Sequence, residues 1–423
     1  FGVLLVPAGR LGDARSRRAV FALGVAVFTA ASALAGAAPN PALLSVARVV
    51  QGFGGAMIAP QVSGFIQSLF YGAERGRAFG LFGATIGLST AIGPVLGGLL
   101  VQVGGTDFGW RLVFYVNLPI GIAVLLLVRK LLPRTEPGPK QSVDPVGVGL
   151  FAVSMLLVLL PLVGSGESQP LSRRPWWLLA VAAAMLVLFG LWERHWDRTG
   201  RETLVDLSLR KVRSYLLGLG LGTAYFAGFT SIFLVVTLYL QTGLHYDPLQ
   251  AGLTQVPFAV GSAGAAWLGG RLVSRFGRPL VVLGLVTVVV GLAGVDLVVA
   301  HVHTDVGFAL APVLLIAGIG GGLVISPNVT LTLADVDVRH AGSGGGMLQT
   351  AQRVGSAIGV AIVLAQFFTR LQADHTDFTG ALSHSLHTTI GFVALALVIG
   401  LADLVFGSGG ITRRRPASAR GGS

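Results

Sequence analysis

The stretch LLSVARVVQGFGGAMIAP, residues 43–60, places one arginine, Arg48, inside an otherwise apolar, glycine-rich segment. Taking a guanidinium out of water costs roughly 3 kcal/mol on membrane-insertion scales. The chain around this stretch is 53% hydrophobic and only 11% charged, whereas soluble domains carry about 25% charged residues. The apolar runs are long and continuous, and backbone groups in lipid must be satisfied internally. The sequence therefore predicts an all-α multi-pass membrane protein.

Twelve complete apolar runs lie between charged or Pro/Gly-rich breaks, and each approaches the length that a membrane-spanning helix needs. We expect spans at 19–37, 41–62, 77–101, 112–132, 145–163, 176–195, 215–240, 251–270, 280–300, 307–333, 341–368 and 386–407. The chain opens inside an apolar run, and we expect residues 1–8 to be the end of a further helix.

The basic residues alternate between the two sides of this arrangement. Of the 30 Lys and Arg residues, 24 fall in every second connection, and two, Arg48 and Arg353, fall within spans. The other four are Arg111, Arg173, Arg174 and Arg370. Because cytoplasmic loops of membrane proteins are rich in Lys and Arg, this bias predicts a cytoplasmic C-terminal tail. It also explains the net charge of +12 without nucleic-acid binding.

The chain contains a weak internal repeat. GRLGDARSRR (9–18) is similar to GRLVSRFGRP (270–279), 261 residues later, and internal repeats are common in secondary transporters. The predicted organisation is an N-terminal transmembrane bundle (1–132), a cytoplasmic linker (133–143), two extra transmembrane helices (144–196), a second cytoplasmic linker (197–213), a C-terminal bundle (214–407) and a basic cytoplasmic tail (408–423).

Several motifs carry a family resemblance. GRLGDARSRR is similar to a G-x-L-x-D-R-x-G-R-R cytoplasmic loop, from which it departs at Ala14 and Ser16. RVVQGFGGA (48–56) resembles R-x-x-Q-G-x-G-A, GPVLGG (93–98) matches G-P-x-x-G-G although Ser89 replaces an upstream glycine, and WRLVFYVNLPIG (110–121) resembles W-R-x-x-F-x-x-N-x-P-x-G. With YLQTGLHYDPLQAGLTQVP (239–257) and GGMLQTAQRVGSAIG (345–359), the chain resembles the major facilitator superfamily, in particular its fourteen-helix drug:proton antiporters of the EmrB/QacA type.

The resemblance implies two pseudo-symmetric six-helix bundles plus two extra central helices, with the first helix and most of the second lying upstream of Phe1. It implies a proton-coupled exporter of amphipathic, cationic drugs or toxic small molecules, working by alternating access in the plasma membrane of a bacterium. The expected partners are small-molecule substrates, protons and membrane lipid, with no nucleic acid and no cofactor. The energy source would be the proton gradient, and the sequence does not define the oligomeric state.

The predicted proton-coupling site contains the two arginines within spans. We favour Arg48 as a buried cation of the central cavity, near Gln51, over an arginine that snorkels to the interface. A buried cation needs a partner, and the resemblance places that partner, an aspartate, in the family's first helix. In the second half, Gln349, Gln352 and Arg353 form the corresponding polar site, with a structural arginine as the alternative.

Three further sets of site residues are predicted. Asp13 is predicted to cap the helix that follows its loop, and the resemblance adds a charge network with Arg10, Arg17 or Arg18 that holds one conformation closed; the two roles are compatible. The gating loop comprises Gly9, Arg10, Asp13, Arg17 and Arg18; the antiporter motif comprises Gly93, Pro94, Gly97 and Gly98, which should bend and thin its helix and, by the resemblance, seal it against protons. Tyr225, Phe226, Phe229 and Phe233 have helical spacing and would line the substrate cavity, although such a stripe is more often packing.

Other functions lack sequence support. No lysine lies in a G-x-x-x-x-G-K-[ST] loop, and neither G-x-S-x-G nor H-E-x-x-H occurs, so we expect no enzyme and no metal site. Within transport, the alternative is an anionic metabolite, because Arg48 and Arg353 without deep acids would create a positive cavity. A membrane sensor without catalytic activity stays a further alternative.

Overall fold

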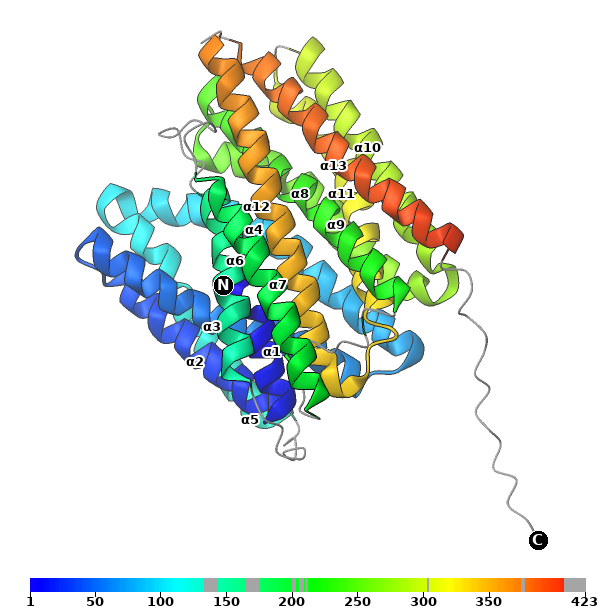
Figure 1. Cartoon of the computed structure of the whole chain (residues 1–423). Helices are drawn as coiled ribbons and strands as arrows, with labels where there is room; N and C mark the ends of the chain where they lie inside the picture. The colour runs from blue at the N-terminus through cyan, green and yellow to red at the C-terminus, as the bar shows by residue number, and fades with distance from the viewer. Residues whose placement is uncertain are drawn as a thin grey trace.

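The computed structural model describes residues 1–132, 144–163, 175–199, 203–204, 209, 212–302, 304–373 and 377–406. Within these residues, every regular element is a helix. The predicted linker 133–143 and tail 408–423 lie outside the described residues, as does most of the linker 197–213. Figure 1 shows the helices as a bundle, with the start of the chain near the middle of the molecule.

The first half of the chain forms a short turn and five helices: η1 (Gly2–Leu4), α1 (Leu5–Ala14), α2 (Arg17–Gly36), α3 (Pro41–Leu69), α4 (Gly72–Tyr115) and α5 (Asn117–Leu131). Two helices, α6 (Pro145–Val163) and α7 (Trp177–Arg198), follow. The second half contains α8 (Arg213–Leu238), η4 (Tyr239–Gly243), α9 (Pro248–Phe276), α10 (Arg278–His301), α11 (Val306–Thr332), η5 (Val338–His340), α12 (Ala341–Ala373) and α13 (Phe378–Phe406).

Local sequence signals explain where several helices begin. Asn40 caps α3 by accepting a hydrogen bond from the Leu43 N–H, directly before a proline at the first helical position. Asp247 and Gln250 form a reciprocal capping box at the start of α9. Within α4, Gly105 has φ 70° and ψ −177°, a backbone conformation that only glycine adopts readily, and the chain breaks its helical path there.

The internal repeat extends through the whole architecture. Adding 261 to the bounds of α1, α2, α3, α4 and α5 places them on the end of α9 and on α10, α11, α12 and α13 respectively. The two halves then meet in two equivalent seams, α1 against α12 and α4 against α9. A Cβ at Gly9 would lie 2.3 Å from the Gly342 carbonyl oxygen, and one at its counterpart Gly270 would lie 2.3 Å from the Gly80 Cα. Glycine therefore lets the backbones touch at both seams.

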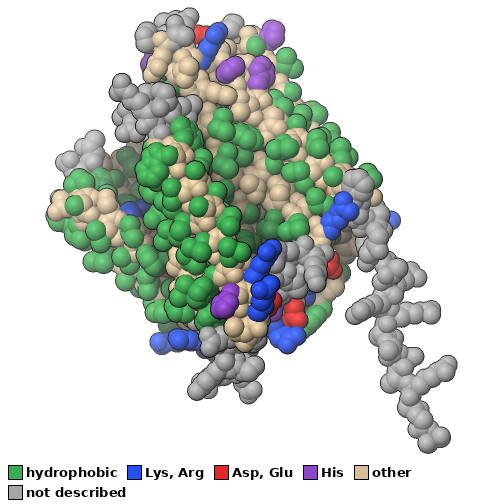
Figure 2. Space-filling model, in the orientation of Figure 1, with side chains coloured by type: hydrophobic (Ala, Val, Ile, Leu, Met, Phe, Trp, Pro, Cys, Tyr) green, Lys and Arg blue, Asp and Glu red, His purple; other side chains and the backbone are tan. Residues whose placement is uncertain are grey.

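Eleven of the helical segments in the described residues are long and apolar enough to cross a membrane. They correspond to every predicted span except 251–270, which lies within the 29-residue helix α9. This helix packs between α4 and α11 through buried glycine and alanine residues such as Gly261, Ala266 and Gly270, and these residues lower its hydropathy. On the face shown in Figure 2, hydrophobic side chains cover the middle of the molecule and Lys and Arg gather near the helix ends.

The two extra helices lie beside the junction of the halves, next to α12 in Figure 1. Phe151 and Met155 of α6 and Phe189 of α7 form a buried cluster with Val6 of α1, against which Met347 of α12 also packs. Asp144 caps α6 through the Val146 N–H and also accepts a hydrogen bond from the Trp192 indole at 2.7 Å. Helices α6 and α7 are therefore anchored to both halves at the α1–α12 seam.

Candidate functional site

A cavity of about 200 Å³ lies between the two halves. The first half contributes residues of α3 and α4, and the second half contributes residues of α8, α11 and α12. The polar lining consists of Ser63, Ser326, Gln349, Gln352 and Arg353. Aromatic rings of Phe1, Phe79, Phe82 and Phe226 form much of the rest. A cavity of this composition suits a molecule that is largely apolar and carries a few polar groups.

The polar side chains of α12 reach across the cavity. The Gln349 side-chain amide donates to the Ala59 carbonyl oxygen at 3.1 Å and to the Ser63 hydroxyl at 3.5 Å, both on α3. The Arg353 guanidinium lies 5.2 Å from the centre of the Phe1 ring. None of the described residues that line the cavity is acidic. The structure thus brings Gln349, Gln352 and Arg353 to one site, with a positive charge.

A polar contact closes the α1–α12 seam at the end of the bundle where the α1–α2, α3–α4 and α11–α12 connections meet, which we call the basic end. The Asp13 carboxylate accepts hydrogen bonds from the backbone N–H groups of Gly342 (3.0 Å) and Ser343 (2.8 Å), in the first turn of α12. It also pairs with Arg17 at 2.9 Å. The first N–H groups of a helix have no partner within the helix, so an aspartate there accepts their hydrogen bonds. Its negative charge also interacts favourably with the positive end of the helix dipole.

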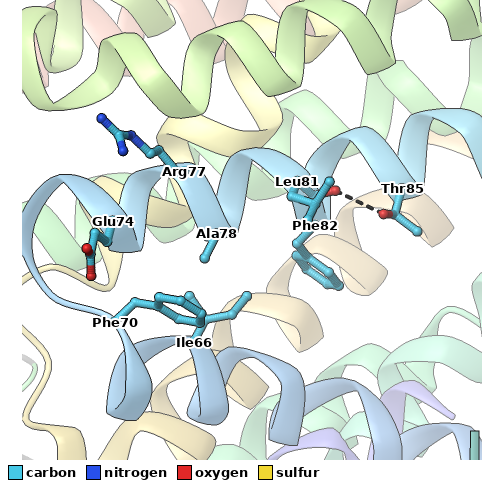
Figure 3. Close-up of a pocket in the computed structure, with 8 residues that line it drawn as sticks. All are labelled: Ile66, Phe70, Glu74, Arg77, Ala78, Leu81, Phe82 and Thr85. Carbon is cyan, nitrogen blue, oxygen red and sulfur yellow. Dashed lines mark hydrogen bonds between the residues drawn. The ribbon is translucent and has the colours of Figure 1, made fainter. Parts of the chain in front are cut away.

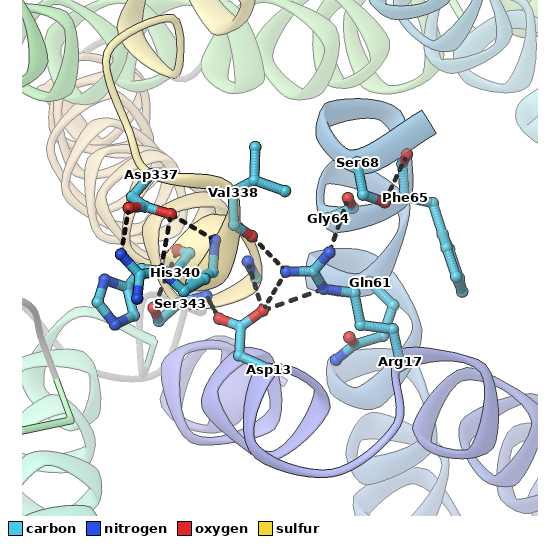
Figure 4. Close-up of polar contacts among 12 residues, drawn as sticks. Asp13, Arg17, Gln61, Gly64, Phe65, Ser68, Asp337, Val338, His340 and Ser343 are labelled. Carbon is cyan, nitrogen blue, oxygen red and sulfur yellow. Dashed lines mark hydrogen bonds and ion pairs between the residues drawn. The ribbon is translucent and has the colours of Figure 1, made fainter. Parts of the chain in front are cut away.

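Arg17 extends the same contact to other helices. Its guanidinium donates to the Val338 carbonyl oxygen at 2.6 Å and to the Gly64 carbonyl oxygen of α3 at 3.3 Å. Figure 4 shows Asp13 and Arg17 pointing toward each other between α1, α3 and the start of α12. We call the contacts of Asp13 and Arg17 with these backbone groups the latch. The latch joins the first half to the second half.

The latch corrects one interpretation of Asp13. Asp13 does not cap α2, because that helix is capped by Ser16, whose side chain accepts from the Ala19 N–H. The helix that Asp13 caps is α12, in the other half of the chain. The reason is that Asp13 still lies within α1, whose side chains on this face point at α12.

The other gating-loop residues have different surroundings. Gly9 touches the backbone of Gly342, one α1 turn away from Asp13. Arg10 is buried, whereas Arg18 donates to the Arg129 carbonyl oxygen and lies outside the latch. Nearby, the Arg339 backbone N–H and guanidinium donate to the Asp337 carboxylate and hold its pKa below the usual range.

Arg48 and Gln51 do not join the cavity. The Arg48 side chain is exposed and donates to Gln51 at 2.6 Å, and Gln51 in turn donates to Ser32 of α2. The guanidinium also lies 5.7 Å from the Phe114 ring. This corrects the prediction of Arg48 as a buried cation in the central cavity, because Arg48 lies about three helical turns before Ala59, the first α3 residue of the cavity lining. The acidic partner expected for Arg48 stays a prediction.

The aromatic stripe of α8 is mainly packing. Phe226 alone of the four predicted side chains lines the cavity described above. Tyr225 and Phe229 are buried in the core of the second half, and Phe229 and Phe233 pack against Phe258 at 5.9 and 4.8 Å between ring centres. The prediction that all four line the cavity is therefore corrected, because the α8 stripe faces α9 and α11 as well as the cavity.

The antiporter motif lies in a continuous part of α4, whose break comes later, at Gly105. A Cβ at Gly98 would approach the backbone of Leu249 at 3.3 Å, so α4 and α9 pack closely there. A Cβ added at Gly93 or Gly97 would meet no described atom within 4 Å, and Pro94 is part of the helix. The proposed seal against protons stays a prediction.

Two polar contacts between distant segments were not predicted from the sequence. The partners of the latch, Gly342 and Ser343, belong to GSGGG (342–346), a small-residue run that marks close packing at a helix start. A buried ion pair also joins Arg278 to Asp403 at 2.6 Å. The repeat contained the signal for it, since Arg278 lies 261 residues after Arg17.

These features define a class of protein: a multi-pass membrane protein with two repeat-related helical halves around a central cavity, the architecture of a secondary transporter rather than a catalytic enzyme. A sequence model of the Major Facilitator Superfamily matches residues 1–360. The chain belongs to this superfamily.

Named relatives and a solved structure agree with this assignment. The chain is 37% identical over 378 residues to a probable actinorhodin transporter of Streptomyces coelicolor, covering 89% of this chain and 65% of that protein. It is 34% identical over 370 residues to the puromycin resistance protein pur8 of Streptomyces alboniger, covering 86% and 71%. The human organic anion transporter MFSD10 has the same fold, with a TM-score of 0.64 at 14% identity over 94% of this chain and 80% of that one. The chain thus spans about two thirds of the length of these bacterial relatives. Its relatives and its candidate spans indicate a bacterial membrane protein.

Proposed function

We propose that this chain belongs to a proton-coupled secondary transporter that exports amphipathic, cationic drugs or toxic small molecules by alternating access. The observation that carries the proposal is a cavity between two repeat-related halves, closed at the basic end by a latch that joins them. The latch consists of one carboxylate and one guanidinium on backbone groups, so separating the halves breaks polar contacts without unfolding a helix. Similarity to antibiotic transport and resistance proteins supports export.

The direction of the molecule follows from its charge. The basic end, with Arg15, Arg18 and Arg75, would face the cytoplasm, and the C-terminal tail would lie on the same side. With the latch closed, the cavity is shut off from the cytoplasm in this conformation. Export would require the latch to open for substrate to reach the cavity and to close before release on the opposite side.

Transport in reconstituted vesicles tests the proposal. The complete protein is placed in proteoliposomes, a pH difference is imposed, and the movement of a fluorescent cationic dye is followed. Dye movement that depends on the pH difference supports antiport, and dye movement that ignores it refutes proton coupling. Arg353→Gln, in the cavity, should lower the rate, whereas Arg370→Gln, an exposed arginine paired with Asp377 outside the cavity, is the matched control.

One observation favours a second candidate, export of an anionic metabolite or drug. Arg353 lines the cavity, and none of its described lining residues is acidic, so the cavity carries positive charge. A cavity with positive charge attracts anions. Competition decides between the candidates: an amphipathic anion that inhibits transport better than a cation of the same size, and loses this advantage in Arg353→Gln, would replace the cationic substrate.

A further inference from the structure

A hollow of about 590 Å³ opens between α2 and α5 at the basic end of the bundle. Both helices belong to the first half and pack against each other, and α2 lies at the edge of the bundle in Figure 1. The polar part of the lining consists of Ser16, Arg18 and Arg129. The remaining lining residues are apolar: Ala19, Ala22, Leu23, Ala26, Leu125 and Val128. We call this space the α2–α5 pocket.

The α2–α5 pocket carries positive charge. Arg18 and Arg129 both line it, and the sequences of α2 and α5 contain no acidic residue. Among the described residues, neither guanidinium forms an ion pair with a carboxylate. The Arg18 guanidinium donates to the Arg129 carbonyl oxygen at 3.1 Å, which holds the Arg18 side chain across the gap between α2 and α5. Two guanidinium groups in one pocket attract an anion, and their planar geometry suits a phosphate in particular.

A larger hollow at the same end of the bundle does not share this charge. It has a volume of about 640 Å³ and lies between the end of α3 and the start of α4. Figure 3 shows that it is lined by Glu74 as well as Arg77. The charges of these two residues oppose each other, so this hollow does not select an anion. Of the two hollows, only the α2–α5 pocket does.

Small side chains give the α2–α5 pocket its length. Ala19, Ala22 and Ala26 are spaced three and four residues apart, so they lie on one face of α2 and leave a trough there. From Ser16 to Ala26 the trough runs about 15 Å along the helix, at the rise of an α-helix. Half of the hydrocarbon core of a bilayer is also about 15 Å thick. An acyl chain from one leaflet therefore matches the trough in length.

The pocket opens on a surface that faces lipid. Leu23 of α2 is 55% exposed and Leu126 of α5 is 57% exposed. Helix α2 and the segment 108–131, which ends in α5, are both long and apolar enough to span a membrane, and such surfaces contact lipid. The two arginines of the pocket lie at the ends of these helices, where the lipid headgroups begin.

We propose that the α2–α5 pocket binds one anionic phospholipid from the leaflet at the basic end. The lipid phosphate would lie between the guanidinium groups of Arg18 and Arg129, and one acyl chain would fill the alanine trough. The Ser16 hydroxyl oxygen accepts from the Ala19 N–H, and its own hydrogen would be donated to the headgroup. A zwitterionic lipid would bring a cationic group close to the same arginines, so phosphatidylglycerol should bind in preference to phosphatidylcholine. Lipid binding in this pocket does not depend on which substrate the transporter carries.

Labelling of a single cysteine in nanodiscs tests the site. The chain contains no cysteine, so Ala22→Cys introduces one thiol into the trough. Leu283→Cys is the matched control, because Leu283 lies 261 residues later, at the same distance from the start of α10, and is 56% exposed. In nanodiscs of equal parts phosphatidylcholine and phosphatidylglycerol, maleimide labelling of Ala22→Cys should be about tenfold slower than in phosphatidylcholine alone, and labelling of Leu283→Cys should be unchanged. Equal slowing at both positions would overturn the proposal.

Replacement of one arginine tests whether the headgroup is recognised by its charge. Arg129→Gln removes a guanidinium from the pocket but keeps the carbonyl oxygen to which Arg18 donates, so the contact between α2 and α5 is preserved. Arg77→Gln removes the same charge from the hollow that Glu74 also lines, and is the matched control. Added to Ala22→Cys, Arg129→Gln should abolish most of the slowing by phosphatidylglycerol, whereas Arg77→Gln should leave it intact. Slowing that persists undiminished in Arg129→Gln would refute a headgroup site at these arginines.

A free phosphate ion could satisfy the same arginines, and two measurements separate it from a lipid. Inorganic phosphate added to nanodiscs of phosphatidylcholine should leave the labelling of Ala22→Cys unchanged, because an ion does not fill the apolar trough. Protection by inorganic phosphate equal to that by phosphatidylglycerol would overturn the lipid assignment. In detergent, phosphatidylglycerol should raise the thermal unfolding temperature of the wild type and of Arg77→Gln more than that of Arg129→Gln, since a ligand stabilises the folded state that binds it. An equal rise in all three proteins would contradict the proposal without use of the cysteine variants.

Discussion

Replacing Asp13 by Asn should open the basic end of the bundle. The Asp13 side chain is fully buried and its two oxygens accept from Arg17, Gly342 and Ser343. Asparagine keeps one acceptor oxygen, but its amide group would face either the Arg17 guanidinium or the N–H groups of α12, which are also donors. The replacement therefore removes the charge and turns at least one hydrogen bond into a clash of donors.

The expected size follows from the contacts that cross between the halves. Arg17 lies in the same half as Asp13, so the part of the effect that falls on the conformation with the basic end closed comes from the Gly342 and Ser343 N–H groups. A hydrogen bond to a charged group contributes about 1.5–3 kcal/mol, and asparagine keeps one acceptor oxygen. We therefore take about 2 kcal/mol, which lowers the ratio of latched to unlatched protein about 30-fold.

Alkylation of a cavity cysteine measures the opening. Ser63→Cys places the only thiol of the chain in the cavity, where the parent serine is 2% exposed. In inside-out vesicles, a membrane-impermeant maleimide should react much faster when Asp13→Asn is added. The control is Asp337→Asn, a half-exposed carboxylate of the same region whose partner Arg339 is two residues away in its own loop. Equal alkylation rates with and without Asp13→Asn would refute the role of the latch.

Three other changes have definite expected outcomes. Gly9→Ala should lower the thermal unfolding temperature in detergent, because the new Cβ would lie 2.3 Å from a backbone oxygen at the α1–α12 seam. The control is Gly149→Ala in α6, whose Cβ would meet no described atom within 4 Å; this variant should leave the unfolding temperature equal or higher. Tyr225→Phe should preserve both unfolding temperature and dye transport, because the buried Tyr225 hydroxyl has no hydrogen-bond partner among the described residues; a loss of transport would restore it to the substrate site. Asp403→Asn should lower the free energy of unfolding by about 3 kcal/mol or more, measured by denaturant titration in detergent, because it leaves the largely buried Arg278 guanidinium without its ion pair.

Much of the fold could be predicted from hydropathy and charge. Both signals are properties of single segments: an apolar run must become a helix in lipid, and its basic flank fixes which side it faces. The signal weakens where a helix is covered by protein. The span 251–270 is an apolar run in the sequence, yet its Gly and Ala residues pack against neighbouring helices and not against lipid.

The site could be predicted only in part, because its contacts cross between the halves. Gln349, Gln352 and Arg353 stand out as polar residues in an apolar helix, and they do reach the cavity. The spacing of the aromatic residues does not show which face of α8 meets α9. It therefore could not predict that Phe226 lines the cavity whereas Phe229 packs against Phe258 of α9. Nor could it show that Asp13 caps a helix that begins more than 300 residues later.

The latch also shows how two related halves come to be unequal. The counterpart of Asp13 in the repeat is Ser274, whose hydroxyl reaches only the Arg271 carbonyl oxygen of its own helix. The helix opposite differs as well: α12 begins at Ala341, whereas α4 begins at Gly72, eight residues before the position equivalent to Ala341. Asp13 therefore meets free N–H groups of a helix start, while the exposed Ser274 side chain donates within its own helix. Among the described residues, the α4–α9 seam packs through small residues without an ion pair, so it could roll without losing a charge contact. We therefore expect the α1–α12 seam to be the one that breaks when the basic end opens.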